Sequence, residues 1–476
     1  MRTINQNNDR VRQSLRMPSS PASRLRKPSA PGWFYAATVI LTFAMMLLIS
    51  DQFLSFLNIH YALKGGSYFS KLHISTYLIW SILLCYLFRF GNPIDVLMVF
   101  VRARPVYIGY FATTSIVAIY LLVLQGVSNV AFMMDTLLRP VGVALLVFSL
   151  APKHRRIVFF VTLGVITLNS IIGITESILV SRLIPYKIHG FSITEDFFRS
   201  TALLGHPLSN ALITAVGLIF ALGYLRSNVA RIIIGAILIT GLLSFGGCTA
   251  LAAALLSVFL MLAIGVVQDL RNGHFKYGES ALLAVALLVA PFLISVMVGS
   301  TNIGSRIIGY LRWGASADAR LESLNLFQYI SMDDLIFGMP VERLGEMTND
   351  IGTIGTIENF WVVLIARMGL IGFGIFFIAL AAFCYRLMQE GKLAAKVAVI
   401  MFLFIASSNN SLSSKSPALC VLVLLIVSGA SYLQNRSIRG NGADKKGSQS
   451  LPRGFRSQQT AGTRRPRSNP NLRPTS

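Results

Sequence analysis

WFYAATVILTFAMMLLISDQFLSFL, residues 33–57, decides the fold class of this chain. Runs of about 20 apolar residues are long enough to cross the ~30 Å hydrocarbon core of a bilayer as a helix. Residues 281–299, ALLAVALLVAPFLISVMVG, form a second such run, and others recur along the chain. The sequence therefore predicts an all-α protein that crosses a lipid bilayer several times.

The composition also favours a membrane environment. Of the 476 residues, 54% are hydrophobic and 13% are charged, whereas soluble domains carry about 25% charged residues. Two tails, 1–32 and 434–476, supply +15 of the net charge of +23. Both are rich in Ser, Pro and Asn and poor in apolar residues, which is typical of disordered chain. Because no basic motif interleaved with aromatic residues accompanies this charge, we expect no binding of nucleic acid.

Hydropathy predicts about twelve transmembrane helices within one domain, residues 33–433. The predicted helices are 33–57, 73–90, 106–124, 136–151, 157–180, 202–224, 232–244, 250–267, 281–299, 357–385, 397–409 and 417–433. With the N-terminus in the cytoplasm, the inner segments carry 30 Lys and Arg residues and the outer segments carry 10. This bias follows the positive-inside rule and predicts that both termini lie in the cytoplasm.

Two of the predicted outer segments are long and polar. Residues 300–356 hold four arginines and seven acidic residues, and residues 181–201 hold further charged residues and a histidine. The inner loops are short by comparison. We therefore expect any chemistry to take place on the outer face, with residues 300–356 partly helical over an outer cavity.

The sequence gives no support for a metal or another cofactor. It lacks a glycine-rich phosphate loop, a zinc-binding motif and a Ser-His-Asp signature. Arginine suits phosphate because its guanidinium group stays charged and donates paired hydrogen bonds. Arginines near the outer ends of helices could together hold a diphosphate, although each alone is equally typical of a solvated loop; they are Arg199, Arg306, Arg312 and Arg320.

The stretch RSTALLGHPLSN, residues 199–210, is the most informative of the outer segments. It places Arg199 just outside a predicted helix, and then His206, Pro207 and Asn210 in its first turns. Polar groups at this depth normally face a bundle interior or an aqueous cavity, and Pro207 is expected to kink the helix. The sequence leaves open whether His206 binds substrate or only packs between helices.

These motifs resemble those of the bacterial O-antigen polymerase and ligase family. An arginine followed by a Gly-x-(Asn/His)-Pro element opens a central helix in that family, as Arg199 and Gly205-His206-Pro207 do here. Residues 316–320 (SADAR) and 335–340 (LIFGMP) are similar to the start and the glycine-rich turn of the family's long periplasmic loop. Residues 358–361 (ENFW) and 369–372 (GLIG) are similar to the segment that follows that loop. The similarity covers roughly residues 150–385.

The resemblance implies a metal-independent glycosyltransferase in the bacterial inner membrane. Such an enzyme transfers glycan from a polyprenyl diphosphate to a sugar hydroxyl on the periplasmic face. The resemblance also implies that Arg199 and Arg320 stabilise the leaving diphosphate and that Glu358 acts as the base. A carboxylate at position 358 is equally expected to cap its helix. The remaining substrate-binding candidates are Arg306, Arg312, His206, Asn359 and Trp361. Proteins that regulate chain length or export the polysaccharide are the implied partners.

Two departures from the family pattern bear on the activity. Ligases place a histidine where this chain has Glu358, which favours a polymerase that joins repeat units into exopolysaccharide or O-antigen. The turn Gly247-Cys248-Thr249 also lacks an arginine that family members usually carry there. A ligase, or a flippase that moves the polysaccharide without any chemistry, remains the alternative.

Overall fold

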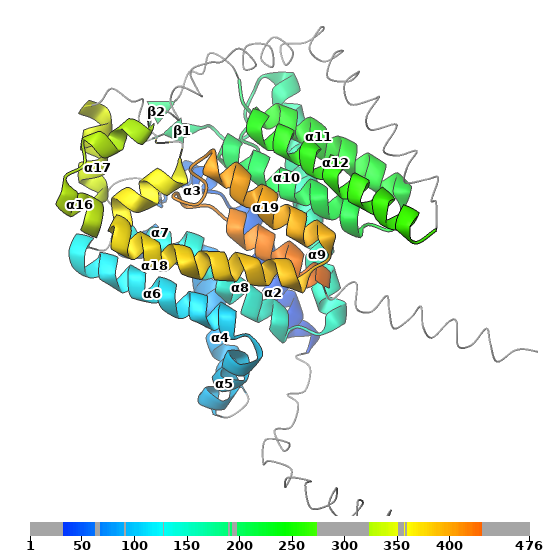
Figure 1. Ribbon diagram of the computed structural model, residues 1–476, viewed down its shortest axis with the longest axis horizontal. Helices are drawn as coiled ribbons and strands as arrows, with labels where there is room; N and C mark the ends of the chain where they lie inside the picture. The colour runs from blue at the N-terminus through cyan, green and yellow to red at the C-terminus, as the bar shows by residue number, and fades with distance from the viewer. Residues whose placement is uncertain are drawn as a thin grey trace, which may run out of the picture. The chain divides into compact units, whose positions relative to one another are not determined.

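The computed structural model shows a multi-pass helical membrane protein (Figure 1). It describes residues 32–61, 67–89, 92–126, 128–188, 191–192, 198–273, 323–350, 357 and 359–430. Within them, seven helices are long and apolar enough to cross a membrane, and an eighth is added if the bent pair α4 and α5 forms one span. The predicted all-α class is therefore confirmed, while the predicted number of twelve spans is not reached in the described ranges.

The helices and strands follow one another in a simple order. The helices that meet the length and hydropathy criteria are α6 (Pro105–Gln125), Val130–Ser149, α9 (Pro152–Leu179), α10 (Pro207–Tyr224), α11 (Asn228–Phe245), α12 (Cys248–Arg271) and α18 (Phe360–Glu390). Val130–Ser149 runs through α7 (Ser128–Phe132), the π-helix η3 (Met133–Leu138) and α8 (Arg139–Ser149). The other elements are α2 (Trp33–Leu48), α3 (Asp51–Phe56), η2 (Tyr68–Lys71), α4 (Ile74–Phe88), α5 (Pro93–Ala103), β1 (Lys187–Ile188), β2 (Phe191–Ser192), η4 (Leu326–Gln328), α16 (Met332–Phe337), α17 (Val341–Asp350), α19 (Leu393–Ser407) and Ala418–Ala430.

Interruptions of the helices explain why fewer spans than predicted are long enough. Each predicted range except 281–299, which lies outside the described residues, coincides with a helix. Four of these helices have only 10–17 residues: α2, α4, α19 and Ala418–Ala430. The predicted helix 33–57 breaks because Ser50 caps a new helix, α3, by accepting a hydrogen bond from the backbone N–H of Phe53. Hydropathy cannot detect such a break inside an apolar run.

The core is built around the short helix Ala418–Ala430. Between residues 418 and 428 no residue is more than 1% exposed, so this helix is enclosed by protein on all sides. Around it, α8 and α10 are mostly buried, whereas the outer faces of α6, α11 and α12 carry exposed apolar residues. Exposed apolar side chains on a helix that spans a bilayer contact lipid, so the outer helices form the lipid-facing surface.

The ends of the bundle alternate as the predicted order of inner and outer segments requires. At one end, the backbone N–H of Ser200 bonds to the carbonyl of Ser244, and that of Phe360 bonds to the carbonyl of Asn409. At the other end, Tyr35 bonds to Ser149 at 2.8 Å, and Arg104 pairs with Glu390 at 2.5 Å. We name the first end the polar end. Which compartment each end faces stays a prediction.

A break inside α18 joins it to the segment before it. At Gly369 the backbone leaves the helix with φ 67° and ψ 169°, and at Gly338 it adopts φ 88° and ψ 159°. Only glycine readily occupies this region. A Cβ on Gly369 would lie 2.3 Å from the carbonyl oxygen of Ile336, and one on Gly338 would lie 2.3 Å from that of Arg367. The two glycines therefore allow two backbones to touch, as the separate parts of α18 beside α16 in Figure 1 show.

The contact between Gly338 and Gly369, here called the joint, also supplies hydrogen-bond partners for backbone groups that lose their helical partners at the break. The N–H of Met339 donates to the carbonyl of Ala366 at 2.8 Å, and the Gln125 amide donates to the carbonyl of Arg367 at 2.7 Å. Residues 370–390 alone measure about 31 Å as a helix and can span the bilayer. Residues 360–368 are thereby released to form a separate short helix at the polar end.

We expect Gly369→Ala to destabilise the protein by several kcal/mol, because an unfavourable φ costs about 1–3 kcal/mol before the backbone clash is added. Gly374→Ala in the same helix is the matched control, since a Cβ there meets nothing within 4 Å. Thermal unfolding in detergent measures both. Equal melting temperatures for the two variants would contradict this account of the joint.

Candidate functional site

The polar end is organised around a buried polar loop, residues 408–417, SNNSLSSKSP. This loop joins α19 to the helix Ala418–Ala430, and Asn409, Ser411, Ser413 and Ser416 in it are all at most 4% exposed. Irregular backbone at membrane depth is tolerated only where protein or a water-filled cavity surrounds it. The 408–417 loop therefore marks the place in the bundle where polar chemistry is most concentrated.

The loop contacts three elements that are distant in the sequence. The Arg367 guanidinium donates to the carbonyl of Ser413 at 3.2 Å, on the α18 side. The hydroxyls of Ser209 and Ser411 lie 3.2 Å apart, which joins the loop to the first turn of α10. The hydroxyl of Thr136 donates to the carbonyl of Ser414 at 2.7 Å. The loop is thus the common neighbour of α10, α18 and the π-helix.

A fully buried carboxylate, Asp135, lies beside the loop in the π-helix. It accepts hydrogen bonds from the Tyr61 hydroxyl at 2.7 Å, the Thr76 hydroxyl at 2.5 Å and the backbone N–H of His73 at 3.1 Å. A buried carboxylate is tolerated when its oxygens are satisfied in this way. The π-helix widens the turn at Asp135, a distortion often found at functional sites.

Lys415 connects the loop to the same region. Its ammonium group donates to the carbonyls of Tyr61 at 2.8 Å and Lys71 at 2.6 Å, and lies 4.2 Å from the centre of the Tyr61 ring. Burial lowers the pKa of Lys415 to about 8. Lys415 thereby holds Tyr61 and Lys71 against the 408–417 loop.

A small cavity of about 20 Å³ separates these groups from the start of α10. Its polar lining includes Asp51, His73, Arg139 and Lys415. A cavity of this size has room for one water molecule and no larger ligand. Arg139 is 2% exposed; it donates to the Ser75 hydroxyl at 3.3 Å, and its Nε has no partner among the described residues.

Asp51 is the second carboxylate at this cavity. Its Oδ1 accepts the backbone N–H of Gln52 at 2.9 Å, and burial raises the pKa of Asp51 to about 6. A Cβ on Gly205 would lie 2.4 Å from this oxygen, and Gly205 has a φ of +80°. Glycine at 205 thus lets the segment before α10 approach Asp51 closely.

Of the predicted site residues, Arg199 and His206 lie together before α10. Burial, and to a smaller extent the positive charge of Arg199, lowers the pKa of His206 to about 4, so His206 is neutral at pH 7. Its Nδ1 is buried and has no hydrogen-bond partner in the described part of the chain. The predicted start of this helix at residue 202 and the predicted kink at Pro207 are wrong. The helix begins at Pro207, because proline fits the first helical position and Gly205 adopts a positive φ.

Asn359 and Trp361 lie at the start of α18, beside the beginning of the 408–417 loop. The Asn359 side chain caps the helix by accepting the N–H of Trp361 at 3.0 Å, and the Trp361 indole donates to Ser407 at 2.8 Å. Both residues therefore have a structural role at the polar end. Glu358, Arg306, Arg312 and Arg320 lie outside the described residues.

The site contains charged groups that the sequence reasoning did not select: Asp51, Asp135, Arg139, Arg367 and Lys415. Each is an isolated charge in or beside an apolar run, which is itself a signal of function in a membrane protein. Arg367 lies at the break in α18, two residues before Gly369, where its side chain reaches the loop.

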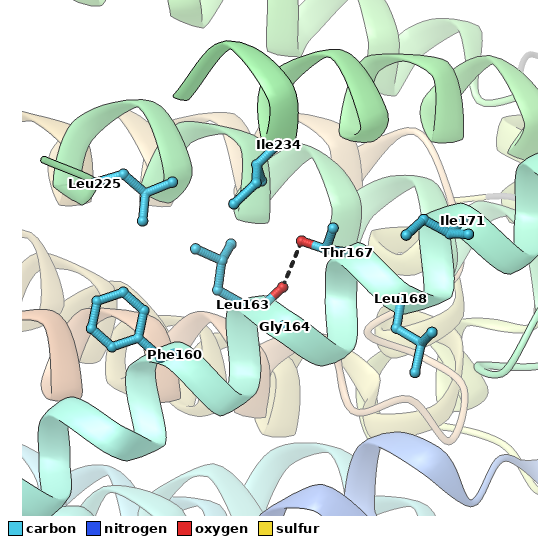
Figure 2. A pocket seen from close by; sticks show the side chains of 8 residues that line it. All are labelled: Phe160, Leu163, Gly164, Thr167, Leu168, Ile171, Leu225 and Ile234. Atoms are coloured by element: carbon cyan, nitrogen blue, oxygen red, sulfur yellow. Dashed lines mark hydrogen bonds between the residues drawn. The ribbon is translucent and has the colours of Figure 1, made fainter. Parts of the chain in front are cut away.

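A separate hollow of about 270 Å³ lies between α9, α11 and the end of α10 (Figure 2). Its lining is almost wholly apolar, and the Thr167 hydroxyl in it bonds to the backbone carbonyl of Leu163 at 2.9 Å. Such a surface suits a hydrocarbon chain of the bilayer and offers no groups for chemistry. The polar end therefore remains the candidate functional site.

Comparisons with known proteins leave the family open. No protein-family model matches the chain, and no curated protein gives a significant match. Among the described residues, no three His, Cys, Asp or Glu side chains lie close enough to bind a metal ion together. The contacts at the polar end are therefore the basis for any functional proposal.

We expect Asp135→Ala to lower the free energy of unfolding by about 3–5 kcal/mol, because three buried donors lose their acceptor and Arg139 loses a nearby negative charge. Asp135→Asn keeps one acceptor oxygen and should cost less. Thermal unfolding in detergent, with the exposed Asp95→Asn as control, measures the difference. A melting temperature for Asp135→Ala near that of the wild type would contradict a central role for this carboxylate.

Asp51 should make stability fall as pH rises. The pKa of Asp51 in the folded state is about 6, which exceeds the ordinary value of about 3.9. Between pH 4 and pH 6 the folded state therefore holds the proton more tightly than the unfolded state does. Relative to Asp51→Asn, the wild type should lose about 2 kcal/mol of stability between pH 4 and pH 7. Unfolding curves at several pH values measure this loss. A constant difference between the two proteins over that range would refute the assignment.

Proposed function

We propose that the protein joins lipid-linked glycan units into a polysaccharide, acting at its polar end. The proposal is supported chiefly by the cationic side chains that gather there around the 408–417 loop. Arg367 and Lys415 contact the loop or its neighbours directly, and Arg139 lines the adjacent cavity. Asp51 and Asp135 offset part of this positive charge, and a lipid diphosphate would supply further negative charge to the three cations.

In the proposed reaction an acceptor hydroxyl attacks the anomeric carbon of the donor sugar. The bond from that carbon to the diphosphate oxygen breaks, the diphosphate leaves with the electron pair, and the hydroxyl proton passes to Glu358. Arg199 and Arg320 stabilise the charge that develops on the diphosphate. His206, neutral at pH 7, contributes a hydrogen bond and no charge. Diphosphate is a good leaving group, so the reaction needs no metal.

The reaction requires the polar end to open. The cavity of about 20 Å³ admits water but no sugar. Residues 323–350 pack on the short helix 360–368 through Leu326, Met339, Leu344, Val362 and Ala366. In this proposal, movement of both segments about Gly369 admits the donor.

Ligation of a finished glycan to another acceptor is the alternative within the same chemistry. Glu358 at the position where ligases carry histidine favours polymerisation. A strain that lacks a polymerase accumulates single repeat units on the carrier lipid. A strain that lacks a ligase accumulates long carrier-linked polymer, so the glycan pattern of a deletion strain decides between them.

Transport of the lipid-linked glycan is a second candidate function, favoured by the interrupted helices. The break at Gly369, the π-helix at Met133–Leu138 and the buried 408–417 loop resemble the discontinuous helices of transporters. A transporter would move labelled carrier lipid across reconstituted vesicles without lengthening the glycan. If the protein moves the carrier lipid across the membrane without lengthening the glycan, transport becomes the proposed function in place of polymerisation.

The polymerase is tested with purified protein and polyprenyl-diphosphate-linked repeat units. Wild type should give a ladder of longer glycans, and Arg199→Ala, Arg320→Ala and Glu358→Gln should each lower the rate by about 100-fold or more. Arg226→Ala, an exposed arginine between α10 and α11, is the matched control and should retain full activity. Gel analysis of the products measures chain length. Absence of a ladder from folded wild type with its native repeat unit would refute the proposal.

A further inference from the structure

The five residues from Arg199 to Leu203 have no regular secondary structure, yet four of their five backbone N–H groups, those of residues 200–203, are bonded. The carbonyl of Arg199 accepts from Arg182 at 3.1 Å, and the N–H of Ser200 donates to the carbonyl of Ser244 at 3.2 Å. The carbonyl of Thr201 accepts from Asn210 at 2.6 Å, and the N–H of Leu203 donates to Asn169 at 2.9 Å. The segment is therefore rigid by means of side chains and not of a helix.

One carboxylate, Glu176 near the end of α9, makes most of the remaining contacts. Its Oε2 accepts the Ser200 hydroxyl at 2.5 Å and the N–H groups of Thr201 at 3.0 Å and Ala202 at 2.9 Å. Its Oε1 accepts the N–H of Leu183 at 2.7 Å. Glu176 is 3% exposed, so these four bonds replace the water that it loses on burial. Within the segment, Ala202 is held at a φ of +39°, which is strained for a residue other than glycine.

Such an arrangement fixes the position of the residues at both ends of the segment. Arg199 begins it. Leu204, which lines the cavity, and Gly205, which lies beside Asp51, follow it and precede His206. A guanidinium group binds phosphate well only if its backbone is held within a fraction of an ångström of the productive place. Residues 199–203 lie in the connection from α9 to α10, so no helix or strand holds the backbone of Arg199 in place, and side-chain hydrogen bonds do so instead.

We propose that Glu176 is a positioning residue that fixes the 199–203 backbone so that Arg199 can bind the diphosphate of the carrier lipid. This inference rests on the proposed role of Arg199 in the function given above. Glu176 itself touches no substrate. It acts through the three donors of the segment, and Arg182 and Asn169 support the same backbone from either side.

The inference is tested by binding of polyprenyl diphosphate to the full-length protein in nanodiscs. Arg199→Ala and Glu176→Gln should each raise the dissociation constant by about tenfold, because the first loses a charge-assisted contact to phosphate and the second misplaces it. The glutamine has one acceptor oxygen in place of two, so it cannot satisfy both Leu183 and the segment. Glu390→Gln, a part-buried carboxylate at the opposite end, is the matched control and should leave binding unchanged.

A double-mutant cycle separates positioning from a general structural effect. If Glu176 acts through Arg199, adding Glu176→Gln to Arg199→Ala should weaken binding by less than about twofold more. Hydrogen exchange at Ser200, Thr201 and Ala202 should accelerate in Glu176→Gln and stay slow in Arg199→Ala. Where Glu176→Gln fails to fold, Arg182→Gln, which loosens the carbonyl of Arg199 from outside the bundle, replaces it in the cycle.

The outcomes distinguish this inference from the proposed function. Fully additive losses in the cycle, or wild-type affinity in Glu176→Gln, would overturn the positioning role even if the wild type makes polymer. Wild-type affinity in Arg199→Ala would overturn it as well. A coupled cycle in a protein that makes no ladder would support the positioning role and refute the polymerase.

Discussion

Burial of the Asp135 carboxylate is the constraint on which the polar end depends. Its oxygens bring together the loop at Tyr61, the start of α4 at His73 and Thr76, and the π-helix itself. The adjacent Thr136 then bonds to the 408–417 loop. Segments that are up to 280 residues apart in the chain therefore meet around one charge. A carboxylate in hydrocarbon is costly, so each partner that satisfies it is also held in place by it.

Hydropathy locates most of the described helices, because apolar runs are a local property of the sequence, while the sidedness taken from the Lys and Arg counts stays a prediction. It predicts the interruptions of the helices poorly. The break at Ser50 and the kink at Gly369 depend on caps and on tertiary contacts that hydropathy does not register. The start of α10 was within reach of sequence reasoning, since Gly205-His206-Pro207 is a local signal for a helix that begins at proline.

The site residues predicted from the sequence stay a prediction. Asn359 and Trp361 lie beside the start of the 408–417 loop, and Arg199 lies near His206 before α10. The segments 335–340 and 369–372 were both selected from the sequence, but their backbone contact through Gly338 and Gly369 appears only in three dimensions. Asp135 and Lys415 were visible as lone charges, yet their partners are too distant in the chain for any local pattern to identify them.

The enclosed helix Ala418–Ala430 has a consequence for how the protein is made. It is the innermost element of the bundle, but it follows all the other described helices in the order of synthesis. The ribosome therefore delivers the surrounding helices before the one they enclose. Until residues 418–430 arrive, these helices lack their central packing partner and the 408–417 loop has no fixed place. Among the described helices, the core of the bundle is thus the last to enter the membrane.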